Sequence, residues 1–130
     1  MSSFKLDSLN ESNDEGPVTM LNLVKYRNES NDDDGTGQDA YKRYASVAGG
    51  LVEAHGGKLL WAGVAAEAAL NEGDSDDDWD WALLVYYPNR AAFVDMVTSV
   101  EYLAANEHRL NGVEKHMILA SKTVVFEQPS

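Results

Sequence analysis

The fold of this chain is decided by residues 79–96, whose sequence is WDWALLVYYPNRAAFVDM. Residues 79–87 carry apolar and aromatic side chains on both faces of an extended segment, which predicts a strand covered on both sides. Pro88 ends this strand, and Asn89 is a favoured N-cap residue. The apolar residues that follow, beginning with Phe93, supply the buried face of a helix. The stretch therefore predicts a strand, a sharp stop and a helix that folds back.

A further strand and a long amphipathic helix are predicted upstream. Residues 17–26 are apolar on both faces of a strand, with Asn22 as the interruption. The helix spans about residues 38–55, and a capping box at Thr36 begins it. Gly56, the first of two adjacent glycines, ends it in the manner of a left-handed cap.

The remaining segments complete the set of strands and helices. Residues 58–70 predict a strand that forms an antiparallel hairpin with residues 79–87, joined by a long acidic tip. A second helical piece begins at Ser99 and closes at Gly112. Alternation of side chains over residues 115–126 predicts the last strand.

The order β-α-β-β-α-β is the split βαβ arrangement, so we predict an α+β, ferredoxin-like fold with a four-stranded antiparallel sheet. Right-handed crossovers place both helices on one face of that sheet. The other face would be left bare, although three of the strands are apolar on both sides. An exposed apolar sheet is by default an interaction site, and we predict a homodimer in which two sheets pack face to face.

Composition restricts the function further. The chain has 130 residues, no cysteine and a formal net charge of −12. The length predicts one domain, residues 17–127, preceded by a polar arm over residues 1–16. The acidic balance argues against nucleic acid and anionic membranes as partners. The absence of a signal-peptide pattern or a membrane span predicts a cytoplasmic protein.

No motif for a metal or cofactor is present. The acidic run that begins at Asp74 has Trp79 where a calcium-binding EF-hand loop needs glycine, and Val85 where it needs glutamate. The three histidines lack metal-ligand spacing, and the sequence has no nucleophile elbow, phosphate loop or dinucleotide fingerprint. We therefore expect no cofactor and read the acidic runs as solvated loops.

A family resemblance supports the fold. The opening strand PVTMLNLVKY over residues 17–26, the segment Trp61-Ala62-Gly63 and the run YPNRAAF over residues 87–93 are similar to a small family of unknown activity. Further positions agree in order and spacing: Tyr41, Tyr44, Met96, Ser99, Glu101, Tyr102, Arg109 and Gly112. This family lies in the dimeric α/β-barrel superfamily. The resemblance implies fold and dimer; relatives in the wider superfamily include cofactor-free monooxygenases, haem-degrading enzymes, and dehalogenating or isomerising enzymes.

A ligand would occupy the space between the sheet and its helices, or the mouth of the barrel. The candidate lining residues are the polar and aromatic side chains expected there: Asn22, Tyr26, Tyr41, Tyr44, Trp61, Trp81, Arg90, Tyr102 and Arg109. Each also has a structural interpretation. Asn22 either satisfies backbone groups or orients a substrate oxygen. The two arginines form ion pairs or bind a carboxylate, and the aromatic residues pack in the core or contact a ligand.

Two functions fit these observations. The first is a homodimer that binds, and oxidises or isomerises without a cofactor, a small apolar or aromatic molecule carrying an oxygen. In that case Asn22 and Arg90 would stabilise negative charge on an enolate-like intermediate. The alternative is a binding or regulatory dimer without chemistry.

Overall fold

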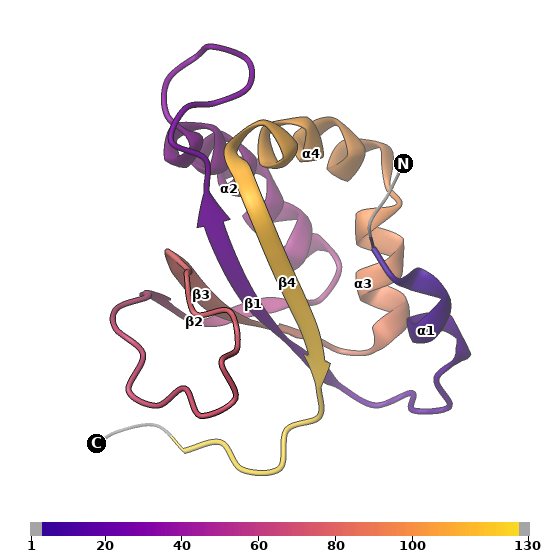
Figure 1. The fold of residues 1–130 in the computed structure, drawn as a ribbon. Helices are drawn as coiled ribbons and strands as arrows, with labels where there is room; N and C mark the ends of the chain where they lie inside the picture. The colour runs from indigo at the N-terminus through magenta and orange to yellow at the C-terminus, as the bar shows by residue number, and fades with distance from the viewer. Residues whose placement is uncertain (1–3, 128–130) are drawn as a thin grey trace.

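The computed structural model describes residues 4–127, which form one sheet and four helices. In chain order the elements are α1 (Leu6–Glu11), β1 (Val18–Tyr26), α2 (Gly37–Ala54), β2 (Lys58–Val64), β3 (Trp81–Tyr87), α3 (Arg90–Val97), α4 (Val100–Gly112) and β4 (Val113–Ser121). All strand pairs are antiparallel, in the order β2-β3-β1-β4. Helices α2, α3 and α4 lie on one side of this sheet (Figure 1). The α+β, ferredoxin-like prediction is confirmed.

The predicted helix starts are confirmed by their capping bonds. Thr36 and Asp39 form a capping box at the start of α2. The side chain of Asn89 accepts a hydrogen bond from the Ala92 amide, and Ser99 caps α4 in the same way. Each cap satisfies an amide that has no partner within its helix, so the polar residues at these positions fix where the helices begin.

Two strands are shorter than predicted. β2 ends at Val64 rather than Leu70, because Val64 already pairs with Trp81, the first residue of β3. β4 ends at Ser121 rather than Phe126, because Ser121 pairs with Thr19 at the beginning of β1. The residues after these points have no partner strand in the part of the chain that the structure describes, so side-chain pattern alone placed the two ends wrongly.

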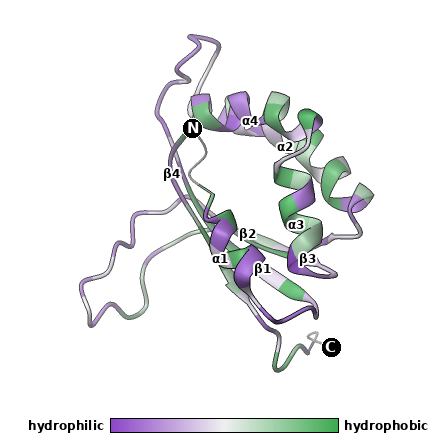
Figure 2. Cartoon of the chain, turned by 90° about the vertical axis from the view of Figure 1, so that its right-hand side faces the viewer, coloured by the Kyte–Doolittle hydropathy of each residue, from purple (hydrophilic) through white to green (hydrophobic). Residues whose placement is uncertain are grey.

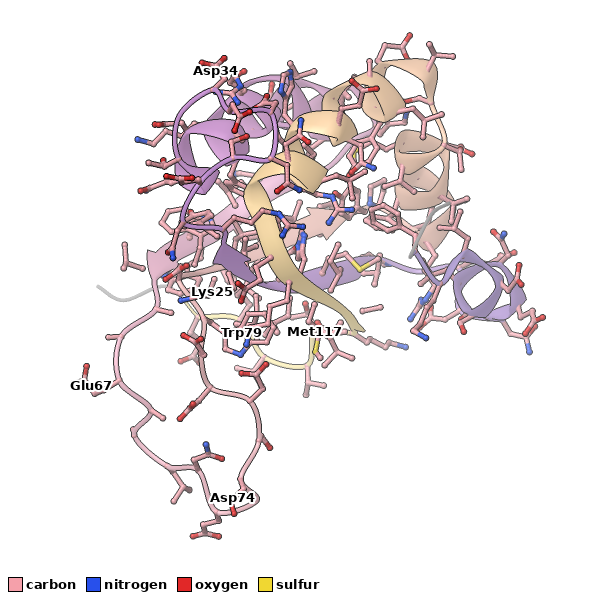
Figure 3. The ribbon with its side chains drawn as sticks, turned by 45° about the horizontal axis from the view of Figure 1, so that its top comes forward. Lys25, Asp34, Glu67, Asp74, Trp79 and Met117 are labelled. Carbon is pink, nitrogen blue, oxygen red and sulfur yellow. The ribbon has the colours of Figure 1, made fainter. Side chains whose placement is uncertain are left out.

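The second acidic segment, residues 65–80, projects from the end of the hairpin, with Asp74 near its tip (Figure 3). Two lysines of the sheet form ion pairs with the last part of this segment, which leads into β3. The Nζ atom of Lys25 lies 3.0 Å from an Asp78 carboxylate oxygen, and Lys115 pairs with Asp76. Lys115 also lies 4.5 Å from the centre of the Trp79 ring. The acidic residues here are thus partly neutralised by the strands they connect.

The N-terminal segment packs against the helical layer. Helix α1 lies beside α3, and Leu6 and Leu9 pack against the main apolar cluster. The Phe4 ring meets Phe93 and Tyr102 edge to face, each at 6.0 Å between ring centres. Arg90 holds the following turn, 3.7 Å from the Asp14 carboxylate. The division into an arm, residues 1–16, and a domain, residues 17–127, remains a prediction.

The face of the sheet away from the helices is apolar and uncovered in the single chain. Trp61, Leu84, Leu21 and Leu119 are successive cross-strand partners, so they form one row across all four strands. Trp61 is 52% exposed and Leu119 58%. Met117, 51% exposed, continues the patch on β4. Figure 2 shows the helices gathered on the opposite side of the sheet. We call the row formed by Trp61, Leu84, Leu21 and Leu119 the apolar row.

Two glycines allow the start of α2 to touch the end of α4. A Cβ atom at Gly37 would lie 2.6 Å from the carbonyl oxygen of Gly112. A Cβ atom at Gly112 would lie 2.4 Å from the carbonyl oxygen of Gly37. Both distances are far shorter than a van der Waals contact, so each position excludes any side chain. This contact fixes the two helices over the sheet.

Candidate ligand-binding site

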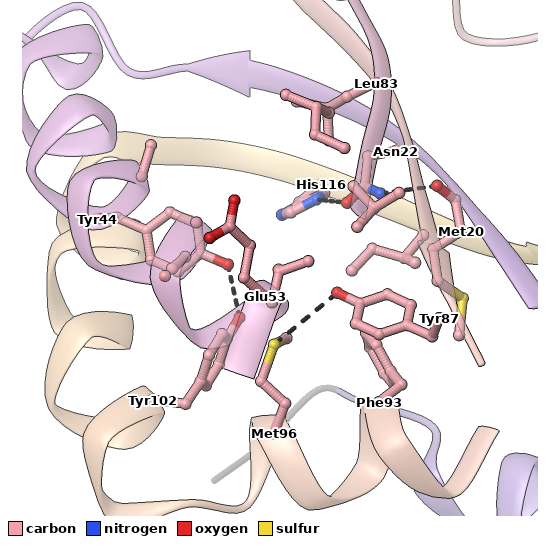
Figure 4. Close-up of a pocket in the computed structure, with 18 of the residues that line it drawn as sticks. Met20, Asn22, Tyr44, Glu53, Leu83, Tyr87, Phe93, Met96, Tyr102 and His116 are labelled. Atoms are coloured by element: carbon pink, nitrogen blue, oxygen red, sulfur yellow. Dashed lines mark hydrogen bonds between the residues drawn. The ribbon is translucent and has the colours of Figure 1, made fainter. Parts of the chain in front are cut away.

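A cavity of about 360 Å³ lies between α2 and the helix-facing side of the sheet. Its volume falls within the range of small-molecule sites. The walls are mainly apolar, and the polar groups come from a few side chains (Figure 4). The sheet contributes Met20, Asn22, Leu59, Leu83, Val85, Tyr87, His116 and Ile118; the helices contribute Tyr41, Tyr44, Ala45, Ala48, Gly49, Gly50, Val52, Glu53, Phe93, Met96 and Tyr102.

A directed chain of hydrogen bonds begins at Asn22 on the sheet wall. Its Nδ2 atom donates to the carbonyl oxygen of Met20 at 3.1 Å, which fixes the orientation of the amide. The Oδ1 atom therefore faces His116, whose Nε2 atom lies 2.9 Å away. The Nδ1 atom of His116 lies 3.2 Å from Nη1 of Arg109. Arg109 in turn donates from Nε to Oδ1 of Asn106 at 2.6 Å.

This chain determines the tautomer of His116. An amide oxygen only accepts, so Nε2 of His116 must carry the proton that it donates to Asn22. The guanidinium of Arg109 only donates, so Nδ1 must be the unprotonated acceptor. Burial and the charge of Arg109 lower the pKa of His116 to about 3, so the ring is neutral near pH 7. Both of its nitrogen atoms are used, and it acts as a positioning group for Asn22.

Asn22 keeps one donor for a ligand. Its side chain has two N–H groups, of which one is bonded to Met20. No second acceptor for Nδ2 is found among residues 4–127. The residue is only 6% exposed and lines the cavity. A buried donor without a partner is costly, and a ligand oxygen in the cavity would satisfy it.

Tyrosine hydroxyls provide the second polar group. The hydroxyl oxygens of Tyr44 and Tyr102 lie 2.8 Å apart, joining α2 to α4. Burial raises the pKa of Tyr44 well above its usual value and also raises that of Tyr102, where the hydrogen bond with Tyr44 and the nearby Arg109 oppose the rise. Both hydroxyls are therefore protonated near neutral pH. Because one hydroxyl donates to the other, the accepting hydroxyl retains a proton that it can donate to a ligand.

Two helix residues without side chains keep the cavity open. Gly49 lies four residues after Ala45 and three before Val52, so it shares their face of α2. A Cβ atom at Gly49 or Gly50 would meet nothing within 4 Å. These glycines are thus not required for close packing against the sheet. They leave empty space at the cavity.

The candidate residues separate into three groups. Asn22, Tyr41, Tyr44 and Tyr102 line the cavity together, while Arg109 lies one hydrogen bond behind its wall. Tyr26 and Trp81 pack in an adjoining cluster with Tyr41 and Val24. Trp61 and Arg90 lie elsewhere. Trp61 belongs to the apolar row on the opposite face, and Arg90 binds the N-terminal segment at Asp14.

His116 is the site residue that sequence reasoning missed. A histidine near the start of the last strand has no distinctive local motif. Its register does carry a signal, because His116 alternates with Ile118 and Ala120, which face the helices, and pairs across from Val24. With strand pairing known, the same alternation places it beside Asn22.

Neither a metal cluster nor a membrane span is found among residues 4–127. No group of three His, Asp or Glu side chains is placed to hold an ion. No helix in this part of the chain is both long enough and apolar enough to cross a bilayer. The cavity offers neutral hydrogen-bond donors from Asn22 and the tyrosines and one carboxylate, Glu53 of α2, in otherwise apolar surroundings. The donors suit a carbonyl or phenol oxygen of a ligand.

The sheet order and helical layer define the class of protein: a ferredoxin-like α+β domain of the kind found in dimeric α/β barrels. Within that class, the chain belongs to the family described as Domain of unknown function (DUF1330), whose model matches residues 33–123. This confirms the family resemblance. No match was found among curated proteins.

Solved structures agree with this assignment. RPA0582 of Rhodopseudomonas palustris, a protein of unknown function, is 31% identical, with a TM-score of 0.83 over 96% of this chain and 95% of that one. A dimeric ferredoxin-like protein from Bacteroides fragilis is 16% identical, with a TM-score of 0.54 over 84% and 98%. The hydroxynitrile lyase of Passiflora edulis is 15% identical, with a TM-score of 0.57 over 88% and 100%. The last two likenesses concern the fold alone.

Proposed function

We propose that this protein is a homodimer that binds a small apolar or aromatic molecule bearing one oxygen atom in the cavity between α2 and the sheet. The observation that carries the proposal is the unused N–H of Asn22, which is buried in an otherwise apolar wall. The ligand oxygen accepts from this N–H, and the tyrosine pair offers a second donor. Apolar side chains such as Leu83 and Ile118 contact the rest of the molecule.

The dimer is supported by the apolar row. Burying a large apolar side chain contributes about 1.5–3 kcal/mol, and the row exposes several of them together. A second copy of the same face would cover them symmetrically. One of the similar structures is itself described as dimeric. In such a dimer, the helices would cover one face of β1 and β3 and the partner's sheet would cover the other face.

A catalytic version of the proposal is favoured by the same N–H. A donor aimed at a substrate oxygen would stabilise an enolate, which is the charge that develops when a proton leaves the neighbouring carbon. The carboxylate of Glu53, which lines the cavity, would accept this proton. Isomerisation returns the proton to another carbon, whereas oxidation requires dioxygen as the electron acceptor. Arg90 lies away from the cavity, so this charge would be stabilised by Asn22 and the tyrosine hydroxyls.

The test uses 2-naphthol and naphthalene, which share a ring system and differ by one oxygen. We expect calorimetry to show at least tenfold tighter binding of 2-naphthol. Asn22→Ala should remove most of that preference, because its loss removes the donor; Asn28→Ala, in an exposed loop, should retain it. Equal affinities for both probes in the wild-type protein would overturn the proposal. Mass spectrometry of the recovered probe then separates binding from turnover.

A further inference from the structure

A second cavity, of about 470 Å³, is lined by residues of α1 and of the outer strand β4, and it shares Met20, Phe93, His116 and Ile118 with the first cavity. Its apolar walls include Phe4, Leu9 and Ile118, and its polar groups include Lys5, Ser8 and Arg109. We propose that this cavity is a separate binding site for an amphiphilic monocarboxylate, whose head group binds Arg109 and whose hydrocarbon tail lies between α1 and β4.

The charges around the cavity support an anion. The chain carries a net charge of −12, and Lys25, Arg43, Arg90, Lys115 and Lys122 each have a carboxylate partner. Among residues 4–127, neither Arg109 nor Lys5 has a carboxylate oxygen within 4.0 Å. Five cations in this part of the chain have no such carboxylate partner, namely Lys5, Arg27, Lys42, Lys58 and Arg109, and two of them line this one cavity. An incoming carboxylate would provide the missing negative charge.

Arg109 also has donors to spare. A guanidinium has five N–H donors, and the bonds to Asn106 and His116 use two of them. A further interaction reaches the hydroxyl of Tyr102. The remaining donors suit the two oxygens of a carboxylate, which arginine binds as a fork. The Phe4 ring, 5.4 Å from the guanidinium carbon, covers one side of the group and helps to fix its plane.

The rest of the cavity suits a hydrocarbon chain rather than a compact polar ion. Its walls are formed by apolar side chains of α1 on one side and of β4 on the other. Leu9 and Ile118 also pack against the main core, so these walls are held in place. A simple inorganic anion would leave most of this surface wet, whereas an alkyl chain buries it at about 25 cal/mol per Å².

The test is calorimetric titration with decanoate and with decan-1-ol, two probes of equal chain length that differ in charge. For the wild-type protein we expect decanoate to bind at least tenfold more tightly. Arg109→Gln should remove that difference, because the guanidinium supplies the charge. Arg43→Gln is the matched control, since Arg43 is paired with Asp32 and Asp34 and does not line this cavity, and it should keep the difference.

A second pair of variants tests the location without altering Arg109. Ser8→Trp fills the cavity from α1 and should reduce decanoate binding at least tenfold, whereas Asn10→Trp, on the exposed side of α1, should not. Gly49→Leu, which fills the first cavity, should leave decanoate binding unchanged. Equal binding of the two probes, or unchanged binding by Ser8→Trp, would overturn the proposal even if Arg109→Gln fails to fold. Loss of 2-naphthol binding alone concerns only the first cavity.

Discussion

The Nε2 atom of His116 donates to the Oδ1 atom of Asn22 across 2.9 Å, so a neutral imidazole on β4 fixes the orientation of an amide on β1. The two residues are 94 positions apart in the chain and become neighbours only through the pairing of these strands. This hydrogen bond therefore links strand pairing to the orientation of the Asn22 amide, which lines the first cavity.

The first prediction concerns the stability of the protein at low pH. Burial lowers the pKa of His116 to about 3 in the folded state, against about 6.5 in the unfolded chain. Below pH 6.5 the unfolded state therefore takes up a proton that the folded state does not. The free energy of unfolding should fall as the pH decreases from 6.5 towards 3, with His116 accounting for about 2–3 kcal/mol between pH 7 and pH 4.5.

Urea unfolding of the wild-type protein and of His116→Gln at these two pH values checks this. The variant should lose less stability on acidification, by about the same 2–3 kcal/mol. The comparison is needed because acidification also destabilises the protein through carboxyl groups whose pKa values are lowered in the folded state. These groups are Asp14, Asp32, Asp39 and Asp76. Equal losses in the two proteins would contradict the assigned environment of His116. NMR should also show the Nε2–H tautomer at pH 7.

The second prediction concerns assembly. Sedimentation at micromolar concentration should give about twice the 14.3 kDa chain mass. Leu21→Asp places a charge at the centre of the apolar row and should produce a folded monomer, because burying an unpaired carboxylate is very costly. Val100→Asp is the control, since Val100 is 79% exposed at the start of α4 and outside the row. A monomeric wild-type protein would argue against the dimer.

The third prediction concerns Tyr44 and Tyr102. Each single change to phenylalanine leaves the other hydroxyl without its partner in a buried setting, and should lower the free energy of unfolding by about 1–2 kcal/mol. The double variant should lose less than the sum of the two, giving a coupling energy of about 0.5–1.5 kcal/mol. Tyr86→Phe, on the opposite face of the sheet, should change stability little. Strict additivity in urea unfolding would argue against the hydrogen bond.

The fourth prediction separates the stability of α2 from the openness of the first cavity. Gly49→Leu should stabilise the protein by about 0.5–1 kcal/mol, because glycine is a poor helix former and the added Cβ meets nothing. The same side chain should weaken 2-naphthol binding at least tenfold by occupying the cavity. Ser46→Leu, at an exposed position on the same helix, serves as control and should leave binding unchanged. Higher stability with unchanged binding would place the ligand elsewhere.

Sequence reasoning predicted the fold well because its signals are local. The caps at Thr36, Asn89 and Ser99 mark where helices begin, and the apolar extended segments identify the strands of the sheet. The two strand ends at Val64 and Ser121 were placed wrongly, since a strand ends where its partner ends, and the partner is distant in sequence.

The candidate site was predicted less completely for the same reason. Asn22 was identified because a polar residue inside an apolar strand needs a partner, but the partner, His116, depends on strand register. Arg90 was expected to line the ligand cavity and to stabilise negative charge there. In the structure, Arg90 instead pairs with Asp14 of the N-terminal segment. The sequence pattern did not predict where this segment packs.

The contact between Gly37 and Gly112 also offers a criterion for recognising related chains. A side chain at either position would clash with the carbonyl oxygen of the other glycine, so replacing either one is enough to disrupt the contact. A distant homologue that retains this helix crossing should therefore carry glycine at both positions, about 75 residues apart as in this chain. The spacing of this pair would distinguish true members from proteins that share only the sheet topology.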